Sequence, residues 1–194
     1  MRYAEVLEGT GRCGRDIANG VWVICEQTSW AQPAHLNVEL PGAGLPTWGH
    51  TSLALLASET AATLAAVEYF VGDQLDELNP EFRPRMREKV RHPILEPYLQ
   101  RTDYWWMAHD KPFTNNWNPG ITSNLLRGAL ACSETADERA DYLLKAVDVL
   151  DHFLNVYPKD GGCEEGPAYW DHASGRILDS LRLLHQATDG VIDI

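Results

Sequence analysis

The sequence predicts an all-α fold built from antiparallel helix pairs, and three observations support this prediction. Apolar residues recur at helical spacing in six segments, whereas the alternation typical of a half-buried strand is almost absent. Proline, glycine and asparagine punctuate the connections between these segments. Some connections are short turns, and others are long, polar and rich in aromatic residues. This alternation is typical of stacked helix hairpins whose long loops share one rim.

The first two predicted helices are recognised by their apolar faces. Residues 12–27 carry Ile17 and Val21 one turn apart, and residues 51–71 repeat apolar side chains at helical spacing before a Gly-Asp stop. The segment 29–47, which separates them, contains three prolines and two glycines. These residues favour turns, so we expect a loop there.

The next two helices follow a proline signal and a long loop. The third helix starts at Pro80, because proline is favoured in the first helical turn. It continues past Pro93, where we expect a kink, to about residue 100. A fourth helix is predicted over residues 121–132, after a loop that covers residues 101–120.

The last two predicted helices are delimited by caps. Thr135 and Glu138 have the spacing of a capping box, which begins a fifth helix that ends near Tyr157. A glycine-rich and acidic loop follows. The sixth helix begins at Pro167 and ends near Gly190.

Composition limits the class of protein. With 194 residues, 44% of them hydrophobic, the chain is predicted to form one helical domain over residues 1–194. Its longest apolar run, residues 53–57, is too short to span a membrane, and no signal peptide follows Met1. We therefore expect no membrane partner, and the compartment stays open. A net charge of −12 disfavours nucleic acid as a partner. The four cysteines lie far apart, which predicts reduced thiols.

The first motif that carries chemistry is Thr-Asn-Asn-Trp-Asn-Pro-Gly at residues 114–120. Asn118 is suited to cap the fourth helix, with Pro119 at its first position. A cap formed by Asn118 gives no role to Asn115 or Asn116. A neutral amide offers two donors to a carboxylate without adding a charge that would rival a nearby base. The motif therefore predicts a carboxylate-binding amide, with the choice between Asn115 and Asn116 open.

The second motif is a glycine-rich and acidic turn, residues 160–170, that leads into the last helix. Tyr169 falls in the first turn of that helix, where backbone N–H groups and the helix dipole stabilise negative charge. Its phenol is therefore a candidate proton acceptor and donor, and a structural tyrosine is the alternative. Glu164 and Glu165 also suit a first helical turn.

Aromatic residues in the long loops suggest carbohydrate binding. The chain has seven tryptophans, several of them in or beside these loops, Trp48 included. Flat rings exposed in a cleft suit the apolar faces of sugar rings. The candidate sugar platforms are Trp30, Trp105, Trp117 and Trp170, with core packing as the alternative for each. His35 lies in the same loop as Trp30 and is a further candidate on this rim.

From about residue 12 to its C-terminus the chain resembles the helical domain of heparinase II/III-type polysaccharide lyases. The resemblance depends most on Asn-Asn-Trp at residues 115–117 and on Asp-Gly-Gly-Cys-Glu-Glu-Gly-Pro-Ala-Tyr-Trp at residues 160–170. It implies a partial α/α toroid that flanking helices and a C-terminal β-sandwich complete in the whole protein. The apolar residues 191–194 agree with the expectation of a chain that continues further.

The resemblance implies β-elimination on a uronic-acid-containing polysaccharide. An asparagine of the first motif holds the uronate carboxylate, Tyr169 acts as general base and acid, and His35 assists. Asn116 lies 53 positions before Tyr169, a separation similar to that in the lyases. Alginate lyases of this type often have histidine where this chain has Trp117. Glu165 would contact the substrate. The implied partner is an acidic polysaccharide or oligosaccharide, and no metal or cofactor is implied.

Two other functions stay open from the sequence. A glycoside hydrolase on an α/α toroid would use a carboxylate pair, Glu164 or Glu165 with Asp171. A helical carbohydrate-binding domain would bind sugar without turnover. Elimination leaves a C4–C5 double bond that absorbs in the near ultraviolet, so absorbance distinguishes a lyase from both.

Overall fold

The computed structural model describes residues 2–39, 45, 52–113 and 115–193, and every regular element in that part of the chain is helical. The all-α prediction is therefore confirmed for these residues. In chain order the elements are α1 (Arg2–Glu8), α2 (Gly14–Glu26), α3 (Pro33–Glu39), α4 (Leu55–Leu78), α5 (Phe82–Val90), η1 (Arg91–Leu95), α6 (Glu96–Gln100), η2 (Trp105–Met107), α7 (Trp117–Cys132), α8 (Ala136–Leu154), η3 (Pro167–Tyr169), η4 (Asp171–Gly175) and α9 (Arg176–Ala187). Trp48 and the predicted helix start at residue 51 lie outside the described residues.

Several elements differ from the sequence predictions. α1 precedes the first predicted helix, and α3 occupies part of the predicted loop 29–47. Pro33 is the first residue of α3, where its missing N–H costs nothing, so a proline that indicated a loop begins a helix. α4 continues through Gly72 to Leu78. A Cβ at Gly72 would lie 2.8 Å from the Arg83 guanidinium, so this glycine makes room for α5 instead of ending α4.

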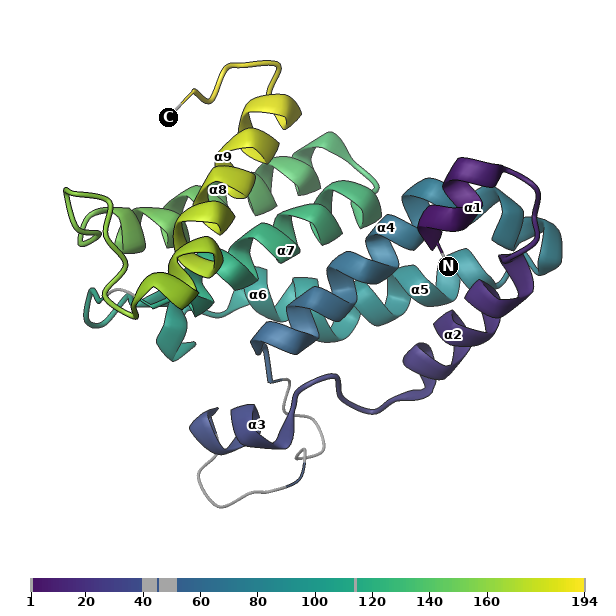
Figure 1. Cartoon of the computed structure of the whole chain (residues 1–194), viewed down its shortest axis with the longest axis horizontal. Coiled ribbons are helices and arrows are strands. Elements are labelled where there is room, and N and C mark those ends of the chain that lie inside the picture. The colour runs from purple at the N-terminus through teal and green to yellow at the C-terminus, as the bar shows by residue number, and fades with distance from the viewer. Residues whose placement is uncertain (1, 40–44, 46–51, 114, 194) are drawn as a thin grey trace.

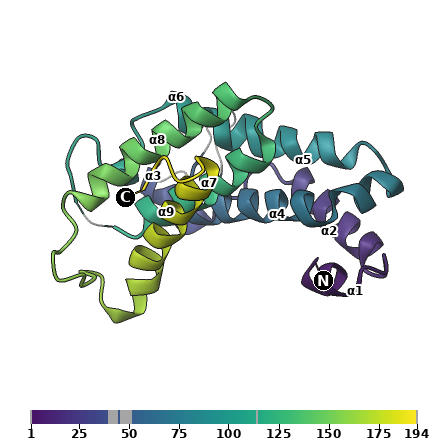
Figure 2. The same ribbon diagram turned by 90° about the horizontal axis from the view of Figure 1, so that it is seen from above.

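α7 is the central helix of the molecule, and Figures 1 and 2 show it between its neighbours. It packs against α4, α8 and α9. Because most of its residues are buried, it lacks a clear polar face, and its first turn was not recognised from the sequence. The helix begins at Trp117 instead of residue 121. Gly120 permits close packing on α4, since a Cβ there would lie 3.1 Å from Leu55 Cδ2.

Two helix hairpins form the frame, as the short turns predicted. Residues 79–81 join α4 to α5, and residues 133–135 join α7 to α8 (Figure 1). The predicted capping box at the start of α8 forms in part, because Glu138 bonds to the residue before the cap instead of to Thr135 itself. Thr135 Oγ1 accepts the Glu138 N–H at 3.1 Å, and Glu138 Oε2 accepts the Glu134 N–H at 2.9 Å. The third predicted helix continues past Pro93 as the π-helical turn η1 and then α6.

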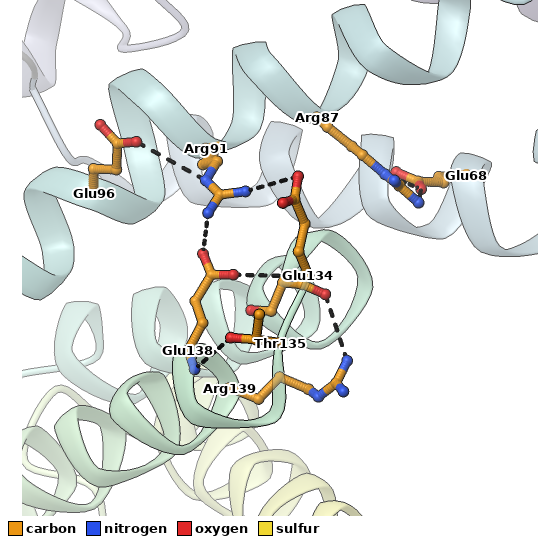
Figure 3. A network of polar contacts seen from close by, with 9 residues as sticks. Glu68, Arg87, Arg91, Glu96, Glu134, Thr135, Glu138 and Arg139 are labelled. Atoms are coloured by element: carbon orange, nitrogen blue, oxygen red, sulfur yellow. Dashed lines mark hydrogen bonds and ion pairs between the residues drawn. The ribbon is translucent and has the colours of Figure 1, made fainter.

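Charged side chains connect the two hairpins (Figure 3). Arg91, at the start of η1, reaches Glu138 in the first turn of α8 at 2.6 Å and Glu134 in the preceding turn at 3.3 Å. Within the first hairpin, Arg87 of α5 pairs with the buried Glu68 of α4. Exposed ion pairs contribute about 0–1 kcal/mol each. The apolar core therefore provides most of the stability.

The described core has one main cluster and two smaller ones, of which one consists of Phe153, Ala173 and Ile177. Buried residues of the main cluster come from α2, α4, α5, η2 and α7, and include Leu64, Leu75, Met86, Trp106, Ile121 and Leu125. The Trp106 indole N–H donates to the Leu53 carbonyl at 3.0 Å, so this fully buried ring is also hydrogen-bonded. A smaller cluster between α7, α8 and α9 includes Leu126, Leu150 and Leu184. None of the described helices is long and apolar enough to cross a bilayer.

Candidate functional site

A pocket of about 210 Å³ lies between α3, the start of α4, the N-terminal half of α7 and the segment η3 to α9. Residues from all of these elements line it. The polar ones that bear on its chemistry are His35, Asn116, Asn124, Tyr169, His172 and Arg176. The three predicted catalytic residues, Tyr169, Asn116 and His35, are among them. The fold therefore brings together residues that are far apart in the chain, and their catalytic roles remain predictions.

The asparagines of the first motif separate into structural and pocket-facing residues. Asn115 Oδ1 accepts the Asn118 N–H at 3.0 Å, so Asn115, and not Asn118, caps the first turn of α7. The buried Asn118 donates its side-chain N–H to the Val149 carbonyl at 2.9 Å, which joins α7 to α8. Asn116 is the asparagine of this motif that lines the pocket. This placement favours Asn116 as the carboxylate-binding amide.

Asn116 already holds a carboxylate in this structure. Its backbone N–H and its side-chain Nδ2 donate to the two oxygens of Glu165, each at 2.7 Å. Both donors lie at the N-terminus of α7, where the helix dipole also favours negative charge. The geometry shows that this position can bind a carboxylate through two hydrogen bonds. Glu165 itself does not line the pocket.

Glu165 is positioned by a turn that only glycine permits. Gly166 has φ +93°, a backbone conformation that L side chains rarely adopt. Its N–H donates to the Cys163 carbonyl at 2.9 Å, and its own carbonyl accepts the Tyr169 N–H at 3.1 Å. One tight turn therefore places Glu165 on Asn116 and begins η3, which carries Tyr169.

Tyr169, His172 and Arg176 form a row along the segment η3 to α9. Tyr169 was predicted in the first turn of one helix, and it ends the short helix η3, which η4 and α9 follow. Its side chain is 46% exposed. The Tyr169 and His172 rings lie 6.0 Å apart, centroid to centroid. Arg176 is held near Asp179, at 3.6 Å, and keeps a guanidinium at the pocket.

His35 reaches the pocket from α3. Its ring meets the edge of Trp117, with the centroids 4.6 Å apart. Its Nδ1 is buried and has no hydrogen-bond partner among the described residues. Burial lowers the pKa of His35, because desolvation penalises the charged imidazolium. At pH 7 this side chain is therefore a neutral donor or acceptor and brings no positive charge to the pocket.

The four tryptophans predicted to bind sugar rings differ in how exposed they are. Trp30 is 8% exposed and donates its indole N–H to the Ile24 carbonyl, so it packs in the core and does not line the pocket. Trp105 and Trp117 pack on each other, 4.9 Å between centroids, behind His35. Trp170 is 55% exposed, and its N–H donates to the Gly161 carbonyl. Trp170 is thus the predicted platform with a face open to a ligand.

Sequence reasoning named neither Arg176 nor His172 as a candidate site residue. The sequence signal that could have indicated these residues is their spacing from Tyr169. Tyr169, His172 and Arg176 stand at positions i, i+3 and i+7, which places side chains on one face of a helix. Arg176 adds positive charge to a pocket that also contains Glu59.

A larger hollow of about 440 Å³ lies at the other end of α4, away from these residues. Its charged groups form pairs with neighbouring side chains. Arg83 reaches Asp73 at 2.6 Å and Asp76 at 2.9 Å, and Glu68 is bound by Arg87. We consider the smaller pocket the better candidate, because acid–base groups and hydrogen-bond donors converge there.

No family model and no curated protein matches the chain. Function is therefore inferred from the chemistry of the pocket residues.

Proposed function

We propose that this chain is the helical part of a polysaccharide lyase, arranged as a partial α/α toroid, that cleaves uronic-acid-containing polysaccharide by β-elimination. The observation that supports this most is the position of Asn116 and Tyr169 on one pocket, although 53 positions separate them in the sequence. An amide that binds a carboxylate and a phenol that transfers a proton are the two groups this reaction needs.

The residues suggest a sequence of steps. The C5 proton of a uronate is weakly acidic, and hydrogen bonds to the adjacent carboxylate lower the barrier to an enolate-like intermediate. Asn116 donates these bonds, and Arg176 adds positive charge. Tyr169, acting as the phenolate, removes the C5 proton and becomes the phenol. It then gives a proton to O4 as the C4–O4 bond breaks and the C4–C5 double bond forms.

Size and charge fit one uronate unit. The pocket of about 210 Å³ is smaller than the roughly 300–1,000 Å³ of sites for drug-sized ligands, so it suits one sugar ring of a longer chain. The exposed ring of Trp170 follows Tyr169 directly and can stack on a neighbouring sugar. Arg176 makes the local field more favourable to an anion than the net charge of −12 suggests.

The test is near-ultraviolet absorbance on uronate polysaccharides with the full-length parent protein, because we expect this chain to be only its helical part. Tyr169→Phe is the main variant. The substitution removes only the phenolic oxygen, so the fold is retained and proton transfer is lost. We expect kcat to fall by about 10²- to 10⁴-fold with KM little changed. The matched control is Tyr69→Phe, because Tyr69 is exposed and lines the other hollow. Wild-type protein without any absorbance change, or a Tyr169→Phe variant with wild-type kcat, would refute the proposal.

Glu165→Gln distinguishes elimination from hydrolysis in the same experiment. In an elimination Glu165 is not a reacting group, so activity should persist. In a hydrolase that uses Glu165 as acid or nucleophile, reducing-sugar release without ultraviolet absorbance should occur in the wild type and disappear in the variant.

Non-catalytic sugar binding is the second candidate, and one observation favours it. The backbone N–H and one side-chain N–H of Asn116 are already occupied by Glu165. A domain that only binds sugar would use the exposed Tyr169 and Trp170 rings and leave this pair intact. It would keep its affinity for oligouronates in Tyr169→Phe and show no turnover.

A further inference from the structure

Two histidines and an aspartate meet outside the candidate site. His109 follows η2, whereas Asp148 and His152 lie one turn apart on α8. Their ligand atoms all lie within 4.8 Å of one another. His109 Nε2 is 3.8 Å from Asp148 Oδ2, His152 Nε2 is 3.9 Å from Asp148 Oδ1, and the two imidazole centroids are 4.5 Å apart.

These distances are too long for hydrogen bonds, so the histidines are not simply bound to the aspartate. His109 Nε2 is buried and has no hydrogen-bond partner among the described residues. An orphan nitrogen of this kind costs free energy unless a proton donor or a metal ion satisfies it. A ring nitrogen aimed at a second histidine and a carboxylate is typical of a metal ligand.

The charges around the three side chains partly balance. Lys145 opposes a cation there, whereas Asp148 and Asp110 favour one.

We propose that His109, Asp148 and His152 bind one zinc ion, with a fourth position left for water. Two imidazole nitrogens and one carboxylate oxygen are a ligand set that zinc accepts, at about 2.0–2.2 Å from each atom. Ligand atoms of a tetrahedral zinc lie about 3.3–3.6 Å apart at these bond lengths, so the three side chains must move together from separations of up to 4.8 Å. His109 is on a loop and can make that movement.

The ion would also join two parts of the fold. It would attach the segment between η2 and α7 to α8, and this segment leads directly to Asn115 and Asn116. Asn118 is already bonded to the Val149 carbonyl, which neighbours Asp148. Zinc would therefore hold the chain before the first motif against α8, and the bond from Asn118 already holds the motif itself against α8. This inference does not depend on the proposed elimination, which needs no metal.

The experiment is a zinc titration of the metal-free chain in competition with a chromogenic chelator. We expect one tight zinc per chain. His109→Ala, Asp148→Asn and His152→Ala should each weaken binding by more than about 10-fold, since even the loss of an outer-shell partner costs about 10- to 100-fold. The matched control is His92→Ala. His92 forms an exposed i,i+4 pair with Glu96 but has no second histidine beside it, so this variant should bind zinc as the wild type does.

Two further measurements complete the test. Far-ultraviolet circular dichroism of each metal-free variant checks that its helices form. Co²⁺ in the wild-type chain should give the visible bands of a tetrahedral nitrogen and oxygen site. Zinc binding that survives Asp148→Asn and His152→Ala would overturn the proposal. A Co²⁺ spectrum with a thiolate charge-transfer band would also overturn it, because that band would place the metal on a cysteine such as Cys163.

Discussion

Three asparagines within four positions have three different tasks. Asn115 caps α7, Asn118 joins α7 to α8, and Asn116 faces the pocket while it binds Glu165. The direction in which each side chain points at the start of α7 determines which of these contacts it makes. Residues that look equivalent in the sequence therefore differ in what their loss should cost.

Alanine substitutions at Asn115 and Asn116 should separate stability from activity. Asn115→Ala removes a cap, so the free energy of unfolding should fall by about 0.5–2 kcal/mol, with kcat retained. Asn116→Ala removes an amide donor whose hydrogen bonds to the uronate carboxylate should strengthen as negative charge builds up in the transition state. We therefore expect kcat to fall, while the urea midpoint of unfolding changes less than in Asn115→Ala. Urea unfolding and the absorbance assay measure the two effects. Equal loss of activity in both variants would argue against the assignment of Asn116.

At the scale of elements, one carboxylate holds α1 to α2. Glu5 of α1 is fully buried, and its two oxygens accept the N–H groups of Gly11 at 2.5 Å and Cys13 at 2.8 Å, at the start of α2. The hydrogen bond from Cys13 is the main reason why the pKa of Glu5 is lowered. The contact replaces an ordinary helix cap with a side chain from the preceding helix.

This carboxylate makes stability depend on pH. A group whose pKa is lowered by folding stabilises the protein above its unfolded pKa, about 4.3 for glutamate, and that contribution disappears as the pH falls through the folded pKa. Glu5→Gln should therefore be less stable than the wild type at pH 7, and the difference should shrink below about pH 4. Urea unfolding at both pH values measures it. Glu8→Gln, at an exposed carboxylate, is the control. A difference between Glu5→Gln and wild type that does not change with pH would contradict the assignment.

At the scale of the whole molecule, the net charge of −12 and the proposed anionic substrate oppose each other. In the proposed reaction Arg176 would attract a uronate at short range, whereas the net charge of the whole chain would repel a polyanion at long range. Added salt shortens the screening length from about 30 Å at 0.01 M to about 10 Å at 0.1 M, which weakens the long-range repulsion before the local contact.

Cleavage of a long polyuronate should therefore become faster as salt is first added. We expect kcat/KM to rise between about 0.01 M and 0.1 M salt, and to rise less for a short oligouronate that carries fewer charges. Initial rates by absorbance at several ionic strengths measure this. A steady decrease of kcat/KM with salt for both substrates would mean that attraction dominates and that the pocket lies in a positive field.

Much of the helical architecture could be predicted because it depends on local chemistry. Helical spacing of apolar residues, the Thr135 capping box and the two short turns led to the α4–α5 and α7–α8 hairpins. α3 was missed because a proline such as Pro33 can either interrupt a helix or begin one. Only its position in the first turn or further along the helix distinguishes these two roles. The start of α7 was missed because burial on nearly all sides removes the amphipathic pattern.

The candidate site could be predicted only as a set of residues. The two motifs led to Asn116 and Tyr169, and the loop that follows Trp30 led to His35, which also lines the pocket. Trp30 was expected on the rim and is buried, because its indole N–H bonds back to α2. Arg176 was missed although it stands two turns after Tyr169. The choice between Asn115 and Asn116 depended on which side chain capped the helix, and capping is decided by the local backbone geometry.

The sequence by itself determined the helical class, the two hairpins and the residue types that carry the chemistry, because periodicity, capping and turns act between residues a few positions apart. Tertiary structure alone decided the rest. It placed His35, Asn116 and Arg176 around one pocket, turned Glu165 onto Asn116, and brought His109 to Asp148 and His152. These contacts join helices separated by tens of residues, and they follow from how buried faces pack, which no short stretch of sequence encodes.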